Sequence, residues 1–350
     1  MKKSFIFGAA LMLMGALSFQ SCTKADNPSV PREPAVAVFD QGMDLADAIA
    51  KFAKDGVLYL PEGIELTMDK QIELAQPLYI VCEGKKPAFI SATAGIVTNS
   101  TLSFENVDID ATELKEPFIQ LATLNNADPV KLDLIAFINS TITGLKYQFI
   151  YANKQKYLVD CINIQKSIIG IDGSKKKTIF DFNGGGLPSF LGVSESTIYA
   201  EPKLEQAGGF FSSQTGSKMS ELGATGQIFS ITNSTLYNIS YNKNTSSTRE
   251  NSQPTQKFAI KNSVIVNCGK SGQFLKGLNN GQAGKDINWE VEGNCFNWGG
   301  EVVAEQKIGS ADDNIKNSID EVIVFADAEK GDFTQKQTSA GDPRWIANAQ

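Results

Sequence analysis

The stretches FSITNSTL (229–236) and FAIKNSVI (258–265) share a pattern that recurs along the chain and decides the fold. Two apolar residues one spacer apart are followed, after another spacer, by a small or polar residue, and then by an apolar residue three positions on. The period of two turns one face of a short strand toward a core, and the small or polar position bends the chain into a second strand. The seven predicted repeats are Leu102, Phe104, Asn106, Ile109; Ile135, Phe137, Asn139, Ile142; Tyr157, Val159, Cys161, Ile164; Leu191, Val193, Glu195, Ile198; Phe229, Ile231, Asn233, Leu236; Phe258, Ile260, Asn262, Ile265; and Trp289, Val291, Gly293, Phe296.

Repeats of this kind predict a solenoid. Successive bend positions are 22 residues (Asn139 to Cys161) to 38 residues (Glu195 to Asn233) apart, so a short unit carries loops of varying length. No such unit can bury its own apolar stripe, and each must be covered by the turns above and below it. We therefore predict an all-β fold, a single right-handed parallel β-helix. A β-sandwich of alternating strands is the alternative.

Asparagine at the bends is predicted to have a structural role. Its short side chain tolerates the left-handed backbone conformation and can hydrogen-bond locally. Asn106 and Asn139 fall in consecutive repeats, as do Asn233 and Asn262. Their side-chain amides are therefore expected to stack as short ladders at the corners of the coils.

The start of the chain predicts export and lipid attachment. Residues 1–21 combine the basic pair Lys2-Lys3 with an apolar run, which is the arrangement of a secretory signal peptide. Ser21-Cys22 at its end resembles a bacterial lipoprotein processing site, which implies that Cys22 becomes the lipid-bearing first residue. An ordinary cleaved signal with an unmodified cysteine is the alternative. Residues 22–38, rich in Asp, Asn, Ser and Pro, are predicted to be a flexible tether to the membrane.

Composition narrows the classes of partner and site. The 350 residues are 42% hydrophobic, which is ample for a core, and the net charge of −7 argues against a nucleic-acid partner. Apart from Cys22 the cysteines are widely spaced and histidine is missing, so no zinc site is predicted. Burial as small apolar fillers is expected for these cysteines, with a Cys268–Cys295 disulfide as the alternative. They are Cys82, Cys161, Cys268 and Cys295.

Residues 39–350 are predicted to form one β-helix domain that begins with a capping helix. The segment DLADAIAKFAK (44–54) has the apolar spacing of an amphipathic helix, with Asp44 as the N-cap and Gly56 at its end. Its apolar face consists of Leu45, Ala48, Ile49 and Phe52. The short apolar runs at 57–63, 72–75 and 78–84 follow as strands.

Several stretches resemble a known superfamily. The helix followed by DGVLYLPEG (55–63), the short coils with Asn at their bends and the ending FADAEKGDFTQKQTSAGDPRW (325–345) are similar to the pectate-lyase-like right-handed parallel β-helix superfamily. More narrowly, IFDFNGGGLP (179–188) and GDPRW (341–345) resemble an uncharacterised group of Bacteroidetes surface lipoproteins. The resemblance covers roughly residues 40–346. It implies the fold and two chemistries, β-elimination of uronates and hydrolysis by paired carboxylates.

The sequence does not supply the residues for either chemistry. The hydrolases that it resembles use a histidine, and calcium-dependent lyases need clustered carboxylates for the ion and an Arg or Lys base of lowered pKa. Asp108 and Asp110 could share a sheet face, and Lys166 or Lys175–Lys177 could supply a base. Solvated outward positions on a coil explain these residues more simply. We therefore predict no catalytic residue, no metal site and no cofactor, and a role for Ca²⁺ has no support in the sequence.

Aromatic residues are the remaining candidates for ligand binding, because exposed rings stack on sugar faces. Tyr147, Tyr151 and Trp298 are the surface candidates, whereas Tyr157 and Trp289 fill core positions of the repeat. The polar insertions 203–227 and 240–256 are predicted to form a variable, ligand-facing edge, with plain spacers as the alternative.

Together these features predict a lipoprotein of the outer membrane, facing the cell surface or the periplasm, that binds glycan or mediates adhesion without catalysis. Its expected partners are the membrane, through the lipid, and a polysaccharide. A divergent polysaccharide (uronate) lyase is one alternative function. A structural component of a surface assembly that handles polysaccharide is the other.

Overall fold

The computed structural model describes residues 39–124, 129–184, 186–201, 208–213, 223, 226–240, 256–278, 287–308 and 314–347. The chain divides into two compact units, Met1–Val38 and Phe39–Gln350, and all described residues belong to the second. The predicted leader, Cys22 and the tether therefore lie outside the described residues. Most residues of the two predicted ligand-facing insertions, 203–227 and 240–256, also lie outside the described residues.

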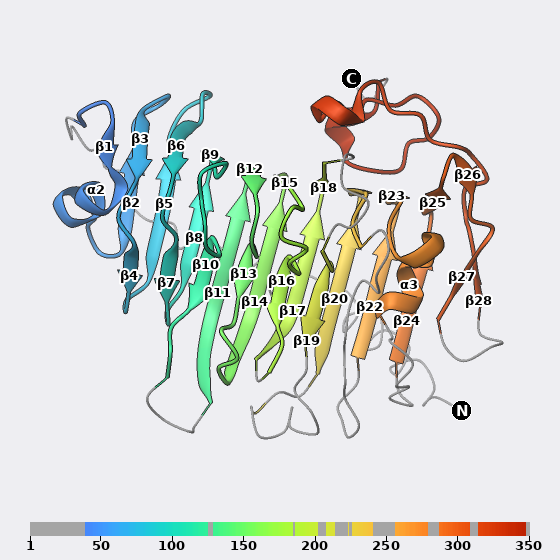
Figure 1. The fold of residues 1–350 in the computed structure, drawn as a ribbon, viewed down its shortest axis with the longest axis horizontal. Coiled ribbons are helices and arrows are strands. Elements are labelled where there is room, and N and C mark those ends of the chain that lie inside the picture. Colours follow the sequence, from blue (N-terminus) through green and yellow to red (C-terminus); the bar gives the residue numbers. More distant parts are fainter. Residues whose placement is uncertain are drawn as a thin grey trace, which may run out of the picture. The chain divides into compact units, whose positions relative to one another are not determined.

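The second unit is a parallel β-helix, as the repeat predicts (Figure 1). In the described residues the coils build three sheets, which we call A, B and C. Each coil adds one strand to sheet B and then one to sheet A, and the first six coils also add one to sheet C. Neighbouring strands come from successive coils and pair in parallel, except that β26 pairs antiparallel with β25 at the end of sheet A. Each coil thereby covers the apolar side chains of the coil before it.

Sheet B carries the apolar pairs of the repeat. Its strands are β2 (Val57–Leu60), β5 (Leu78–Cys82), β8 (Leu102–Glu105), β11 (Val130–Ile138), β14 (Tyr157–Gln165), β17 (Leu187–Ser194), β20 (Gln227–Thr232), β22 (Gln256–Lys261) and β24 (Ile287–Glu292).

Sheet A follows the bend in each coil and is the longest sheet. Its strands are β1 (Met43–Asp44), β3 (Glu65–Met68), β6 (Ala88–Ala92), β9 (Val107–Asp110), β12 (Thr141–Leu145), β15 (Ile168–Ile171), β18 (Thr197–Ala200), β21 (Thr235–Tyr237), β23 (Val264–Val266), β25 (Cys295–Trp298) and β26 (Glu301–Val302).

Sheet C closes the first six coils. Its strands are β4 (Ile72–Leu74), β7 (Ile96–Thr98), β10 (Ile119–Leu121), β13 (Ile150–Tyr151), β16 (Phe180–Phe182) and β19 (Phe211–Ser213). Strand β19 corrects part of the prediction for the insertion 203–227. Phe210 and Phe211 within it are buried in the core, because the coil still needs an inward pair at this level.

The second apolar residue of each repeat forms a continuous column through the core. Consecutive partners in sheet B are Phe104, Phe137, Ile164, Val193, Ile231, Ile260 and Val291. Six of the seven residues predicted for this column are therefore correct. The third, Val159, is wrong.

The error in the third repeat comes from an interruption of the alternation in β14. Val159 and Ile162 both face the core although they lie three residues apart, and Cys161 falls inside the strand. Register places Ile162, Ile164, Lys166 and Ile169 in the repeat instead of Tyr157, Val159, Cys161 and Ile164. The bend of this coil is at Lys166, which has φ of 49°.

Phenylalanine rings fill the centre of the solenoid. Neighbouring ring centroids from Phe104 to Phe258 are 5.4–6.0 Å apart, mostly tilted or edge to face. Such pairs contribute beyond their buried area, and truncation of one buried Phe to Ala typically costs about 3–5 kcal/mol. The interior is therefore packed with side chains.

The bends between sheets B and A have left-handed backbone at every described level from the third coil on. The residues with positive φ are Asn106, Asn139, Lys166, Glu195, Asn233, Asn262 and Gly293. One rung of the predicted amide ladder is described, in which Nδ2 of Asn139 donates to Oδ1 of Asn106 at 3.2 Å. The residues that follow the bends form a longer ladder of hydrogen bonds from coil to coil.

This longer ladder is made by buried serine hydroxyls. The N–H groups of Val107, Ser140, Ser167, Ser196 and Ser234 donate at 3.0–3.2 Å to the Oγ of Ser140, Ser167, Ser196, Ser234 and Ser263, respectively. Each of these Oγ atoms also donates to the carbonyl two residues before it. At the last rung Oδ1 of Asn294 accepts from the Ser263 N–H at 2.9 Å. Buried backbone donors at the corners are thus satisfied by the neighbouring coil.

Helix α2 (Leu45–Phe52) caps the first coil. Asp44 is its N-cap and accepts from the Ala46 N–H at 2.9 Å, as predicted, while Leu45 and Ala48 are fully buried. The helix ends at Phe52, before the predicted Gly56. Gly56 instead lies in the following turn with φ of 78°, where a Cβ would be 2.7 Å from the Pro77 carbonyl oxygen.

The last coils close differently. In the eighth coil the short helices η1 (Lys270–Gly272) and α3 (Phe274–Leu278) follow β23 in place of a sheet C strand. After the ninth coil (β24 and β25) and β26 comes the hairpin of β27 (Glu305–Lys307) and β28 (Asn314–Lys316). Val303, Ile308 and Ile315 of this region pack against the core. No helix among the described residues is long and apolar enough to cross a membrane.

Candidate functional site

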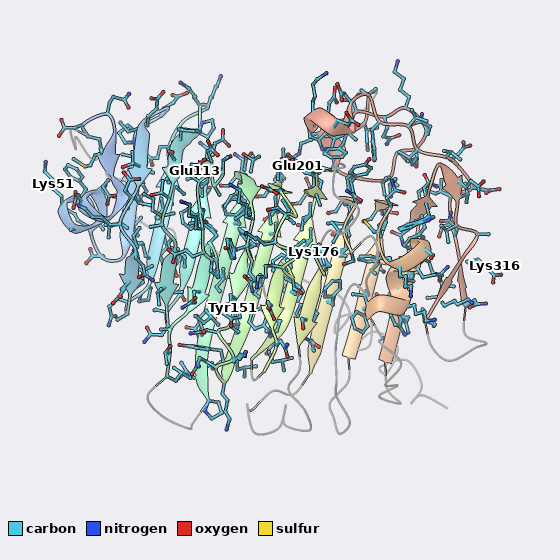
Figure 2. All side chains as sticks on the ribbon, viewed as in Figure 1. Lys51, Glu113, Tyr151, Lys176, Glu201 and Lys316 are labelled. Atoms are coloured by element: carbon cyan, nitrogen blue, oxygen red, sulfur yellow. The ribbon has the colours of Figure 1, made fainter. Side chains whose placement is uncertain are left out.

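The outer face of sheet C brings together an aromatic ring, an amide and a carboxylate. Gln120, Tyr151 and Asp181 are successive partners on β10, β13 and β16, while Ile119, Ile150 and Phe180 beside them point into the core. Neighbouring strands lie about 4.8 Å apart. We call Gln120, Tyr151, Asp181 and the adjacent Gln148 the sheet C patch. Tyr151 lies near the middle of the solenoid (Figure 2).

The polar groups of the sheet C patch are held in place by the coil. Oδ2 of Asp181 accepts from Nε2 of the buried Gln148 at 3.3 Å, and Oδ1 accepts from the Asn183 N–H at 3.1 Å. Partial burial raises the pKa of Tyr151, and the nearby Asp181 carboxylate adds to this effect. Tyr151 therefore stays a neutral phenol at physiological pH, and Asp181 offers oriented acceptor oxygens beside its ring.

The three aromatic residues predicted for sugar stacking fall in two places. Tyr151 is half-buried on the outer face of sheet C, and Tyr147 is half-buried on the loop before it, next to Gln148. Trp298 ends β25, far along sheet A, and packs over Gly272. The structure therefore brings Tyr147 and Tyr151 to one region and leaves Trp298 in another.

The two aromatic residues predicted at core positions, Tyr157 and Trp289, pack in or against the core. Tyr157 is fully buried, and its hydroxyl donates to the Ala122 carbonyl at 3.0 Å. Burial raises its pKa to about 12. Trp289 is partly buried and stacks on Phe258 with a centroid distance of 4.7 Å.

The carboxylates and lysines considered for catalysis do not converge. Asp108 and Asp110 share the outer face of sheet A on β9, alternating with the buried Val107 and Ile109. Lys166 is at a bend beside Glu195, 3.8 Å away, and Lys175–Lys177 are exposed on the loop before β16. Hydrogen bonds to carboxylates are the first cause of a raised pKa at Lys70, Lys131, Lys261 and Lys330.

The cysteines and carboxylates give no metal-binding cluster in the described ranges. There, no three Cys, Asp or Glu side chains are grouped as a metal site. Cys82, Cys161, Cys268 and Cys295 are all buried, so the predicted role as small fillers is correct. Cys268 and Cys295 are free thiols, so the alternative of a disulfide between them is wrong. Burial raises the pKa of Cys268 to about 12 and of Cys295 to about 11.

The C-terminal segment makes a second polar constellation, which we call the strap (residues 319–347). It runs along the outer face of the later strands of sheet A (Figure 1). Its Phe333 is fully buried, with ring centroids 5.1 Å from Tyr199, 5.5 Å from Tyr237 and 6.0 Å from Trp345. The strap thus completes a small apolar layer outside the solenoid.

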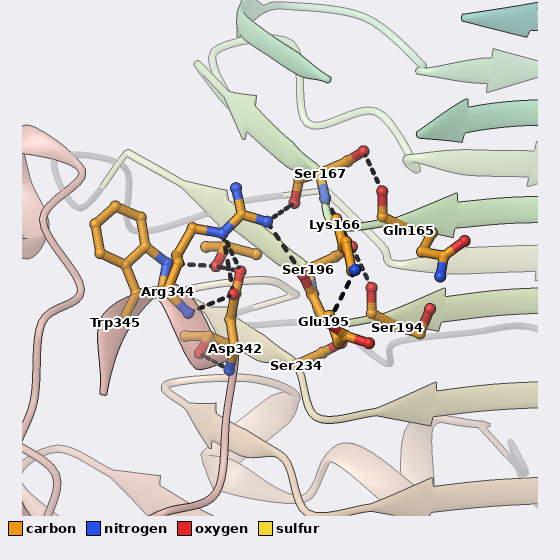
Figure 3. A network of polar contacts seen from close by, with 12 residues as sticks. Gln165, Lys166, Ser167, Ser194, Glu195, Ser196, Ser234, Asp342, Arg344 and Trp345 are labelled. Carbon is orange, nitrogen blue, oxygen red and sulfur yellow. Dashed lines mark hydrogen bonds and ion pairs between the residues drawn. The ribbon is translucent and has the colours of Figure 1, made fainter. Parts of the chain in front are cut away.

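A network of polar contacts ties the strap to the bends (Figure 3). Oδ2 of the buried Asp342 accepts from the Thr197 hydroxyl at 2.8 Å, and the Trp345 indole donates to the same hydroxyl oxygen at 2.7 Å. Nη2 of Arg344 donates to the carbonyls of Ser167 and Glu195, while its Nε pairs with Asp342 at 2.9 Å. The GDPRW ending is therefore a structural fastening in this chain. Periodicity could not reveal it, because its partners lie about 150 residues away.

Comparison with known proteins gives one family. Residues 65–201 match the model of a family described as "Domain of unknown function (DUF4957)". The match runs from β3 through β18 and includes the whole sheet C patch and the β9 carboxylates. No curated protein matches the chain. The family match carries no statement of activity.

Proposed function

We propose that this chain is a lipid-anchored cell-envelope protein that binds glycan through the sheet C patch, without catalysis. The observation that carries the proposal is the register of Gln120, Tyr151 and Asp181 on one outer face. A tyrosine ring offers an apolar surface to the C–H face of a pyranose. The flanking amide and carboxylate offer donors and acceptors to its hydroxyl groups.

The register of the coils supports a polymeric rather than a small ligand. The patch sits on successive coils, so its three groups line up parallel to the axis of the solenoid. An extended glycan laid along this axis would meet one group per coil. Glu73 and Val97 continue the same outward column toward the N-terminal end, and Ser212 continues it toward the other.

The anchoring half of the proposal rests on the leader and on Cys22. A cleaved signal followed by a lipid-bearing cysteine and a polar tether would hold the β-helix at the outer membrane. A membrane-held binding protein of this kind would retain polysaccharide at the cell envelope.

A glycan array tests the binding function. Purified protein is expected to be retained by at least one class of polysaccharide. Tyr151→Ala should lower that retention roughly two- to tenfold, since an aromatic contact is worth about 0.5–1.5 kcal/mol beyond its buried area. Tyr79→Ala is the matched control, because Tyr79 is a half-buried outward tyrosine on sheet B. Absence of retention on all glycans, or equal loss in both variants, would refute the proposal. A rise in ultraviolet absorbance from an unsaturated product of any uronate polymer would point to a lyase.

A further inference from the structure

Two outward columns of side chains run along sheet A. One column contains Glu65, Phe89, Asp108, Thr141, Ile168, Thr197, Thr235, Val264 and Cys295 in continuous register. The other contains Thr67, Ser91, Asp110 and Thr143 in the early coils, and Gly170, Tyr199, Tyr237, Val266 and Asn297 in the later ones. Only the later part is covered by the strap.

The strap shows how this face holds a polypeptide segment. Threonine hydroxyls of the first column bind it, since Thr235 Oγ1 accepts from the Asp342 N–H at 3.1 Å and Thr197 binds the Asp342 carboxylate. Aromatic rings of the second column, Tyr199 and Tyr237, pack against Phe333. These contacts leave Thr197 and Thr235 almost fully buried.

The same columns continue into a half that no described segment of the chain covers, which we call the open face. It consists of Glu65, Thr67, Phe89, Ser91, Asp108, Asp110, Thr141 and Thr143. Phe89 is 41% exposed, the only aromatic ring among the exposed large hydrophobic residues of the described chain. Threonine hydroxyls and an aromatic ring, as in the covered half, thus recur here, and no described segment covers them.

The open face differs from the covered half in charge. Its outward positions carry three carboxylates, on Glu65, Asp108 and Asp110, and no lysine or arginine. Asp108 is half-buried beside Phe89, and its Thr141 neighbour donates a hydrogen bond to it. Burial raises the pKa of Asp108 despite that hydrogen bond, because partial loss of water disfavours the ionised carboxylate. A cation placed beside it would stabilise the ionised form.

We propose that the open face is a docking site for a positively charged polypeptide segment of a partner protein. The partner lies against sheet A in line with the strap, sets basic side chains on Asp108 and Asp110, and covers the Phe89 ring. Continuity with the strap interface favours a polypeptide over a glycan at this place. The net charge of −7 disfavours a second copy of this chain as the occupant.

Fluorescence anisotropy with a synthetic probe tests this docking site. The probe is a labelled peptide that alternates lysine with valine, and its counterpart has glutamate for lysine. Full-length protein is expected to bind the lysine peptide in a salt-sensitive manner and to ignore the glutamate peptide. The paired substitution Asp108→Asn with Asp110→Asn should weaken binding roughly tenfold or more, because loss of even one charged hydrogen bond weakens binding by about tenfold.

The matched control removes the same charge from another face. Asp133 and Asp160 are outward on β11 and β14 of sheet B, so Asp133→Asn with Asp160→Asn should leave binding within twofold of the wild type, roughly the effect of a rim charge. Absence of lysine-peptide binding, equal binding of both peptides, or equal loss in both paired variants overturns the docking site. Loss of glycan retention in the Asp108 and Asp110 variant, with retention kept in Tyr151→Ala, also overturns it by making the open face a glycan site.

Discussion

Replacement of one ladder serine, Ser196→Ala, is expected to destabilise the solenoid far more than its size suggests. Ser196 is fully buried at the bend between β17 and β18. Its Oγ accepts from the Ser167 N–H at 3.0 Å and donates to the Ser194 carbonyl at 2.7 Å. The alanine variant keeps the backbone but leaves the Ser167 N–H buried without that acceptor.

The cost follows from the two lost hydrogen bonds. An orphaned buried donor costs about 1–3 kcal/mol, and the loss of an ordinary hydrogen bond adds about 0.5–1.5 kcal/mol. We therefore expect the free energy of unfolding to fall by about 2–4 kcal/mol. Urea unfolding followed by far-ultraviolet circular dichroism measures this change as a lower midpoint with an unchanged slope.

The control is a serine on the same coil that faces outward. Ser194 is half-exposed at the end of β17, and Ser194→Ala keeps the carbonyl to which Ser196 donates. Its effect should stay within about 0.5 kcal/mol, as is usual for surface substitutions. A Ser196→Ala variant that is as stable as Ser194→Ala would show that the serine ladder does not hold the coils together.

Three further predictions concern the strap, the thiols and the anchor. Burial raises the pKa of Asp342 despite the neighbouring Arg344, so the stability that this carboxyl contributes is fully present below its unfolded pKa of about 3.9 and is lost as pH rises through its folded pKa. Over this pH window the urea midpoint of the wild type should therefore fall relative to that of Asp342→Asn, and parallel curves would contradict the assignment. The buried thiols, with Cys268 at a pKa of about 12, should resist iodoacetamide at about pH 8 and all react in urea, whereas fast labelling of folded protein would contradict their burial. Cys22→Ala should move the protein out of the membrane fraction and abolish a lipid adduct by mass spectrometry, whereas an unchanged distribution would refute lipid attachment.

Sequence periodicity was sufficient for the architecture because the same physical requirement recurs in each coil. Phe104, Phe137, Val193, Ile231, Ile260 and Val291 were placed in one column by their spacing from a bend, and they lie there. The third repeat failed where two inward residues, Val159 and Ile162, lie three apart. Tyr157 to Ile164 satisfies the same spacing by chance, and Lys166 is an unusual choice for a left-handed bend.

Contacts outside the core were harder to predict because they depend on register between distant segments. The serines after the bends follow Asn139, Asn233 and Asn262 directly in the sequence, but their hydroxyls accept hydrogen bonds from the neighbouring coil, which no local pattern shows. The fastening of Asp342 to Thr197 joins residues 145 positions apart and has no local pattern. Tyr151 could be proposed from its residue type, whereas its neighbours Gln120 and Asp181 emerge only once the coils are stacked.

Hydrogen exchange in the presence of ligand tests the proposed function most directly. The glycan best retained on the array is added to the full-length protein, and amide exchange is compared with and without it. Binding at the sheet C patch predicts slower exchange in β10, β13, β16 and the loop 146–149, with no change on the outer face of sheet B. Slower exchange confined to sheet B or to the open face of sheet A, with unchanged rates around Tyr151, would contradict it.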